Sequence, residues 1–211
     1  MTDGAGAFVL QVNDLRYRYL PLAFAVDLPF RGVFPADRLT SPGNDPVLGV
    51  WLFSSANRVP NPALALVRAD IRTVDLTSPS QPAAAEPAAF AVVEVDVGEE
   101  TFYGVTGPDG QGAVYFPYPS FASPVGFTSP VMAMPPQSWS LAIRVRYEPS
   151  VQNVLPGSTV PDVISMFVQS QASIWENEAG DLMDELPLDF AFGEKPVLHT
   201  GEQSTLWVSS V

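Results

Sequence analysis

Apolar and polar residues alternate with a period of two in four separate stretches of the chain. The clearest stretch is 141–147 (LAIRVRY), and 65–72 (ALVRADIR), 91–97 (AVVEVDV) and 15–19 (LRYRY) show the same period. Because successive side chains of a strand point to opposite faces, this pattern predicts strands that each bury one face. In the second and third stretches, the side chains expected to face inward are Val67, Ala69, Ile71, Val93, Val95 and Val97.

Two shorter stretches, 47–53 and 113–116, are continuously apolar and are typical of strands that are buried on both faces. The tight turn Gly107-Pro108-Asp109-Gly110 predicts a hairpin that joins 101–105 to 113–116. At least six strands are therefore expected before residue 150, with turns rather than helical patterns between them. This order favours an all-β antiparallel sandwich over an alternation of strands and helices.

The pattern changes after residue 149. The stretch 164–174 (ISMFVQSQASI) alternates, which favours a strand, although Pro161 suits the first turn of a helix. We divide the chain into a β-sandwich domain, residues 1–149, and a C-terminal β extension, residues 150–211. The pattern leaves open whether this extension packs on the sandwich or on a partner. Further short strands are expected at 188–192, 197–198 and 205–208.

Two proline-rich segments interrupt the strands. Residues 77–87 (TSPSQPAAAEP) have no apolar periodicity and are expected to form an exposed loop or an excursion at a sheet edge. Residues 117–136 contain six prolines, so they cannot pair as a central strand, yet they are too apolar for an idle solvated loop. We predict that this segment contacts another protein subunit or a sugar; the alternative is that it folds over the open end of its own sandwich. The predicted contact residues are Tyr118, Phe121, Phe127, Met132 and Met134.

Charge and composition narrow the range of partners. The 211 residues carry a formal net charge of −13, which repels nucleic acid and anionic membrane surfaces. The absence of cysteine excludes disulfides, thiolate metal sites and cysteine nucleophiles. The N-terminus lacks the pattern of a signal peptide, and no apolar run reaches the ~20 residues that cross a bilayer. We expect a cytoplasmic protein that neither binds nucleic acid nor inserts into membranes; homo-oligomerisation stays open.

Few residues could carry chemistry. His199 is the only histidine and no Gly-x-Ser-x-Gly motif accompanies it, and Gly-rich nucleotide-binding motifs are also absent from the sequence. Glu94 and Asp96 share the polar face of a predicted strand and are expected to be solvated, with an unrecognised carboxylate site of an enzyme as the alternative. The acidic run 176–185 lacks the spacing of a calcium loop, and cation binding there stays open. We expect no catalytic residue, no cofactor and no metal.

The stretch 103–116 (YGVTGPDGQGAVYF) resembles the Thr-Asp-x-x-Gly-x-x-x-Phe hairpin of carboxypeptidase-regulatory-like, transthyretin-like sandwich modules. The stretch 60–67 (PNPALALV) is similar to the beginning of an earlier strand in those modules. The resemblance covers residues 45–149 and implies an immunoglobulin-like or transthyretin-like sandwich, of a kind that generally acts in folding, attachment or assembly without catalysis. The whole chain also looks like accessory structural subunits of phage tails and tail-like contractile injection particles. We therefore expect a structural subunit that docks onto other subunits, with a carbohydrate-binding or small-ligand-binding module as the alternative.

Overall fold

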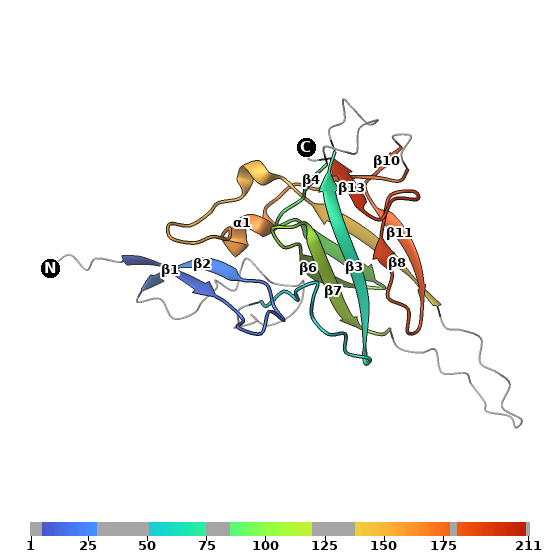
Figure 1. The fold of residues 1–211 in the computed structure, drawn as a ribbon, viewed down its shortest axis with the longest axis horizontal. Helices are drawn as coiled ribbons and strands as arrows, with labels where there is room; N and C mark the ends of the chain where they lie inside the picture. The colour runs from blue at the N-terminus through green and yellow to red at the C-terminus, as the bar shows by residue number, and fades with distance from the viewer. Residues whose placement is uncertain (1–5, 29–50, 75–84, 120–137, 178–180, 210–211) are drawn as a thin grey trace, which may run out of the picture.

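The chain folds into a sandwich of two β-sheets with a separate two-stranded ribbon on the N-terminal side of the sandwich (Figure 1). The computed structural model describes residues 6–28, 51–74, 85–119, 138–177 and 181–209. These residues confirm the prediction of an all-β sandwich. The ribbon consists of β1 (Gly6–Val12) and β2 (Leu22–Leu28), which pair antiparallel.

The two sheets of the sandwich differ in size and in strand direction. The larger sheet follows the order β10-β9-β13-β3-β12, with β4 and β7 also paired with β3, and the smaller follows β11-β8-β5-β6. The strands of the larger sheet are β3 (Leu64–Thr73), β4 (Glu86–Pro87), β7 (Gln111–Pro117), β9 (Ser173–Trp175), β10 (Leu182–Met183), β12 (Val197–Leu198) and β13 (Leu206–Ser209). Those of the smaller sheet are β5 (Val92–Val97), β6 (Glu100–Val105), β8 (Ser138–Arg146) and β11 (Leu186–Ala191).

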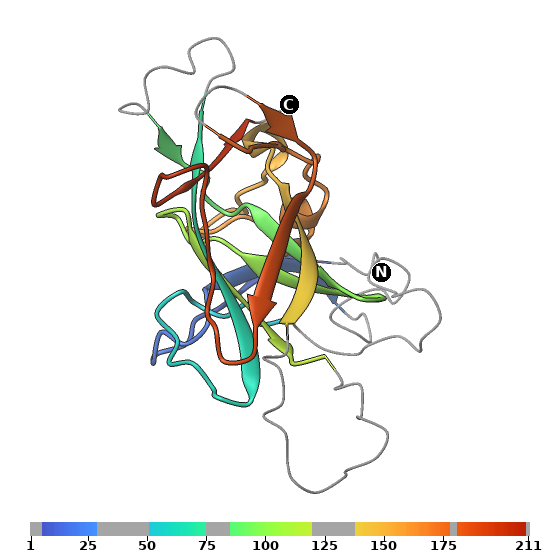
Figure 2. The same ribbon diagram turned by 90° about the vertical axis from the view of Figure 1, so that its right-hand side faces the viewer.

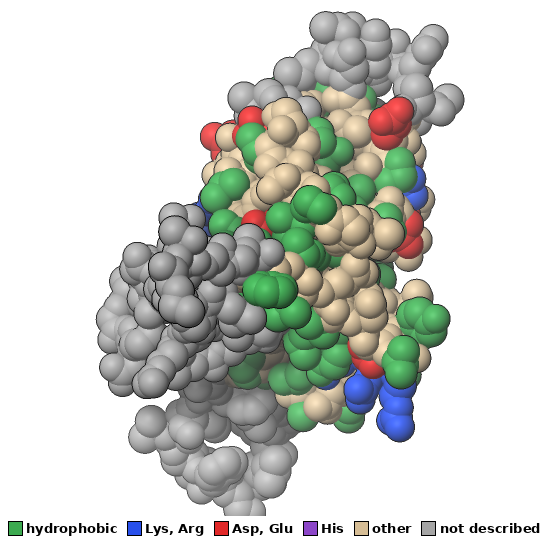
Figure 3. Space-filling view, turned by 90° about the vertical axis from the view of Figure 1, so that its left-hand side faces the viewer, with side chains coloured by type: hydrophobic (Ala, Val, Ile, Leu, Met, Phe, Trp, Pro, Cys, Tyr) green, Lys and Arg blue, Asp and Glu red, His purple; other side chains and the backbone are tan. Residues whose placement is uncertain are grey.

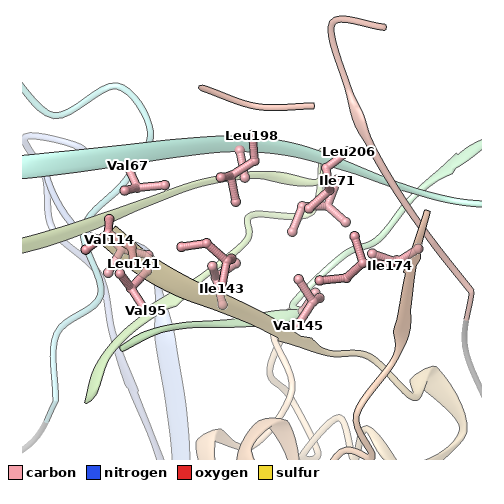
Figure 4. Packing of buried hydrophobic residues seen from close by; sticks show 14 of the residues in the cluster. Val67, Ile71, Val95, Val114, Leu141, Ile143, Val145, Ile174, Leu198 and Leu206 are labelled. Atoms are coloured by element: carbon pink, nitrogen blue, oxygen red, sulfur yellow. The ribbon is translucent and has the colours of Figure 1, made fainter. Parts of the chain in front are cut away.

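The main core lies between the facing sides of these two sheets. Figure 4 shows Val67 and Ile71 of β3 pointing toward Ile143 and Val145 of β8. The period-two pattern placed these side chains correctly, because a strand that buries one face must alternate. Val97 is only partly buried, near the end of β5. The other side chains predicted to face inward, namely Ala69, Val93 and Val95, are buried in the same cluster.

The residues after 149 add strands to both sheets of the sandwich. The C-terminal extension therefore packs on the sandwich of its own chain. β11 pairs with β8 along the edge of the smaller sheet, as Figure 2 shows where the two strands run side by side. β12 and β13 both pair parallel with β3, so the larger sheet is mixed rather than purely antiparallel. The strands expected at 188–192, 197–198 and 205–208 are present as β11, β12 and β13.

The predicted hairpin through Gly107 and Gly110 is wrong, because its two strands belong to different sheets. β6 pairs with β5, whereas β7 pairs with β3. The turn at 107–110 carries the chain from the smaller sheet to the larger one. The last residue of the turn is bonded to β3, because the Ile71 N–H donates to the Gly110 carbonyl at 2.9 Å. This bond places the beginning of β7 beside β3. Local turn chemistry was predicted correctly, but the partners of the strands were not.

Three other segments differ from their predicted structure. Within 164–174 the chain forms a short helix, α1 (Val163–Phe167), because the Asp162 side chain accepts a hydrogen bond from the Ile164 N–H and caps its first turn. Residues 15–19 form a turn instead of a strand, and 51–53 form no strand; 47–50 lie outside the described residues. A 3-10 helix, η3 (Pro149–Val151), follows β8.

Of the helices that the structure describes, none has the length and apolar character needed to span a membrane.

Much of the two proline-rich segments lies outside the described residues. Within 77–87, the described part includes β4, which pairs with Arg72 and Thr73 of β3. This part therefore forms a short strand beside β3, as an excursion at a sheet edge would, and residues 77–84 lie outside the described part. Within 117–136, only residues 117–119 are described.

Candidate docking surface

The N-terminal ribbon is attached to the sandwich through one of its two strands. Leu22 and Phe24 of β2 are buried in a second hydrophobic cluster, on the opposite side of the smaller sheet from the main core. Val92 and Val105 contribute from that sheet, and α1 contributes Met166. Since burial of a large apolar side chain stabilises by about 1.5–3 kcal/mol, this cluster holds β2 firmly against the sandwich.

The other strand of the ribbon leaves its apolar side chains about half exposed. Phe8, Leu10 and Val12 of β1 occupy alternate positions and therefore share one face of the ribbon. Their partners on β2, in the same order, are Val26, Phe24 and Leu22. All three side chains of β1 are nevertheless exposed, at 39–51%. Figure 3, which views the molecule from the ribbon side, shows a band of hydrophobic side chains there. Contiguous exposed apolar surface of this kind commonly marks an interaction site.

The turn after β1 is organised by one carboxylate. Asp14 accepts hydrogen bonds from the Arg16 N–H, at 3.0 Å, and from the Arg18 N–H and Nε, at 3.0 and 3.2 Å. The hydrogen bond from the Arg16 backbone, followed by those from Arg18, holds the pKa of Asp14 below its ordinary value of 3.8 despite some desolvation. An aspartate that binds nearby amides competes with a strand ladder, which explains why the alternation at 15–19 gives a turn.

This turn holds two large apolar side chains out in solvent. Leu15 is 91% exposed and Tyr17 is 79% exposed, the latter with φ of 54°. A bulky residue rarely adopts the left-handed region, and such backbone strain persists where the surroundings enforce it, as the Asp14 hydrogen bonds do here. We call Phe8, Leu10, Val12, Leu15 and Tyr17 together the ribbon surface.

Contacts behind the turn fix its position relative to the sandwich. The Arg58 guanidinium lies 5.0 Å from the ring centres of both Tyr19 and Tyr115 and donates to Ser54 Oγ at 2.7 Å. The Tyr115 hydroxyl donates to the Arg58 carbonyl at 2.9 Å. The ribbon surface is thus supported by β7 of the sandwich through Arg58 and its two tyrosine neighbours.

The charge of the ribbon surface differs from that of the rest of the chain. β1 contains no charged residue, and the turn places two of the ten basic residues of the chain, Arg16 and Arg18, in solvent. The chain as a whole carries −13. Since Asp14 pairs with Arg18, the positive charge of Arg16 stays unbalanced at the turn. The ribbon surface is therefore apolar along β1 and weakly basic at its end, on a chain that is acidic as a whole.

Tyr118, the described member of the predicted contact residues, packs on its own chain. Its ring centre lies 4.6 Å from that of Phe192 and 5.9 Å from that of Trp139, and its hydroxyl accepts a hydrogen bond from the Gly193 N–H at 3.2 Å. Tyr118 therefore contacts side chains and backbone of its own chain, and its role in partner binding stays a prediction. The other predicted contact residues, Phe121, Phe127, Met132 and Met134, lie outside the described residues.

Glu94 is buried, contrary to the prediction that it is solvated with Asp96. Its carboxylate lies 2.6 Å from Arg146 Nε and 3.2 Å from Arg144 Nε, and Asp96 lies 2.6 Å from Arg144 Nη2. Tyr103, directly opposite Glu94 on β6, has its pKa raised by burial and by the Glu94 charge. The arginines balance both carboxylates, an arrangement that suits a structural ion-pair ladder across β5 and β8.

The remaining sequence candidates lie apart from the ribbon surface. His199 is exposed, with Nδ1 at 2.7 Å from the Gly201 carbonyl oxygen. In the acidic run, Asn177 Nδ2 donates to Asp181 Oδ2 at 2.7 Å, and residues 178–180 lie outside the described part. Within the described ranges, no three His, Cys, Asp or Glu side chains are grouped so that they could hold a metal ion.

Sequence reasoning missed the ribbon surface because the alternation at 15–19 looks like a half-buried strand. The signal that could have revealed it is the pair Asn13-Asp14 directly before that stretch, since both residue types favour turns.

No protein-family model, curated protein or solved structure matches this chain.

Proposed function

We propose that this chain is a non-catalytic structural subunit that docks onto a larger protein complex through the ribbon surface. The observation that carries the proposal is the hydrogen-bonded turn that holds Leu15 and Tyr17 in solvent, next to the exposed apolar face of β1. Large apolar side chains are unfavourable in water, and a partner that covers them recovers about 25 cal/mol per Å² of buried apolar area.

The turn is held in place by hydrogen bonds within the isolated chain, and this preorganisation favours a role in docking. Association loses conformational freedom at the contact, by about 0.5–1.5 kcal/mol for each side chain that becomes fixed. Because Asp14 holds the backbone of Arg16 and Arg18 before any partner arrives, the main chain of the turn has little freedom left to lose. Tyrosine, the residue type at position 17, also often dominates the binding energy of an interface.

The class of complex rests on the resemblances of the sequence. Transthyretin-like modules act in attachment and assembly, and accessory subunits of contractile tail-like particles are the first class to test. Under this proposal the protein acts in the cytoplasm or as part of such a particle. The segment 117–136 stays predicted as a second contact, of which the structure describes residues 117–119.

Replacing both Phe8 and Leu10 by serine should release the chain from its complex. Loss of two partly buried apolar anchors is expected to cost a few kcal/mol of binding free energy, which lowers the assembled fraction at least about tenfold. Size-exclusion chromatography with native mass spectrometry, on tagged chain purified from its source cells, measures that fraction. The wild-type chain should run in a particle far above 22.7 kDa and the variant at that mass.

The matched control replaces Val154 and Val168 by serine, since both are exposed apolar side chains outside the ribbon, at 55% and 62%. This control should assemble like the wild type. Both variants should unfold in a single thermal transition at a temperature close to that of the wild type. A wild-type chain that runs alone at 22.7 kDa, or a folded ribbon variant that stays assembled, contradicts the proposal.

A further inference from the structure

One edge of β1 is not paired with any strand in the described part of the chain. β1 pairs with β2 over its whole length, from Gly6 opposite Leu28 to Val12 opposite Leu22. No other described strand pairs with β1, which leaves the main-chain groups along its second edge without a ladder partner. An uncharged, apolar strand with an open edge is what natural sheets usually avoid by means of lysine, proline or a cover.

We propose that β1 receives an extended segment of the partner protein as an added strand, an inference that rests on the proposed function. Main-chain hydrogen bonds to the open edge would supply affinity, and alternate side chains of the added strand would lie beside Phe8, Leu10 and Val12. Since these three side chains are apolar and share one face, the added strand has apolar residues at every second position.

The charges at the turn determine what lies at one end of the added strand. Arg16 is exposed and has no carboxylate within ion-pair distance among the described residues, while Arg18 pairs only with Asp14. Both arginines follow the C-terminal end of β1. Carboxylates at the adjoining end of the added strand would therefore be attracted to Arg16, the arginine whose charge is not balanced by Asp14. Antiparallel strand pairs are commoner than parallel ones. If the added strand runs antiparallel to β1, its N-terminal end lies next to the C-terminal end of β1 and hence next to these arginines.

The same charges and the size of the surface argue against a second copy of this chain as the occupant. Each copy carries −13, so two copies repel each other. Described edge strands that follow carboxylates, such as β6 and β11, already pack apolar side chains against the main core of their own sandwich. The exposed apolar side chains of β1 amount to on the order of 300 Å², whereas each partner in a stable interface buries about 800 Å². A surface of this size fits a single strand better than a second folded body.

The test uses synthetic peptides and fluorescence anisotropy with the full chain. The probe is a labelled, amidated peptide of two aspartates followed by three Thr-Val repeats, for which we expect a Kd on the order of 10–100 µM. N-methylation of alternate residues, which removes the donors along one edge, should weaken binding at least about tenfold. Moving the aspartates to the C-terminus should weaken binding about threefold to tenfold, and Arg16→Ala should abolish that difference.

Controls separate strand addition from general adhesion. Val154→Ser with Val168→Ser should bind the probe like the wild type, and Phe8→Ser with Leu10→Ser should not bind it. Equal binding of the N-methylated peptide, or no binding of any peptide at about 1 mM, overturns the inference. Reversible dimerisation of the wild-type chain in analytical ultracentrifugation, lost in Phe8→Ser with Leu10→Ser, overturns it in favour of a second copy. If assembly depends on Phe8 and Leu10 but the peptides do not bind, this inference fails and the proposed function stands.

Discussion

Replacing Gly110 by alanine should lower the free energy of unfolding by about 3–4 kcal/mol. Gly110 has φ of 79°, a conformation that costs residues with a side chain roughly 1–2 kcal/mol. In addition, a Cβ atom at this position would lie 2.5 Å from the Ile71 carbonyl oxygen, closer than such atoms approach each other, so the backbone must shift. That shift disturbs the hydrogen bond from the Ile71 N–H to the Gly110 carbonyl and hence the start of β7.

Gly98→Ala is the matched control for this effect. Gly98 has φ of 64°, but no heavy atom lies within 4 Å of an added Cβ, so only the conformational cost of about 1–2 kcal/mol applies. Urea unfolding followed by tryptophan fluorescence measures both variants. Equal losses at the two positions would show that the turn does not press against β3 as described.

Replacing Arg144 and Arg146 together by methionine should cost about 3–5 kcal/mol of stability, because Glu94 is then left buried without a positive charge. The Glu94 carboxylate is nearly inaccessible to solvent, whereas both arginines are partly exposed and lose less by removal. Methionine keeps much of the apolar stem of each arginine, so the change tests charge more than packing.

Adding Glu94→Gln to the double variant should restore a large part of the lost stability, since a neutral amide is far less costly to bury than an unpaired carboxylate. The free energies of unfolding of the wild type, the double variant and the triple variant form the measurement. A triple variant that is no more stable than the double variant would mean that the ion pairs do not hold Glu94 in place.

The sequence was most informative where a strand buries one face against the sandwich. The stretches 65–72 and 141–147 were predicted correctly because the two facing sheets impose strict alternation on β3 and β8. The same period at 15–19 was misleading, because the Asp14 side chain binds amides that a strand would have used. Alternation alone cannot distinguish a half-buried strand from a turn that exposes Leu15 and Tyr17.

Strand pairing was less predictable, because it depends on contacts between residues far apart in the chain. The turn chemistry at 107–110 is local, but the choice of β3 as the partner of β7 depends on Ile71, almost forty residues earlier. The parallel pairing of β12 and β13 with β3 leaves no mark in the short stretches 197–198 and 206–209. Burial of Glu94 likewise requires knowledge that β8 places two arginines beside β5.

Hydrogen–deuterium exchange of the assembled complex tests docking through the ribbon surface most directly. Amides of Phe8–Val12 and Leu15–Tyr17 should gain at least about tenfold protection relative to the isolated chain, because a partner covers them. The amides of β6, one of the two edge strands of the smaller sheet, serve as the internal reference and should not change. Protection gained at β6 or at another sheet edge, with residues 8–17 unchanged, would contradict the account.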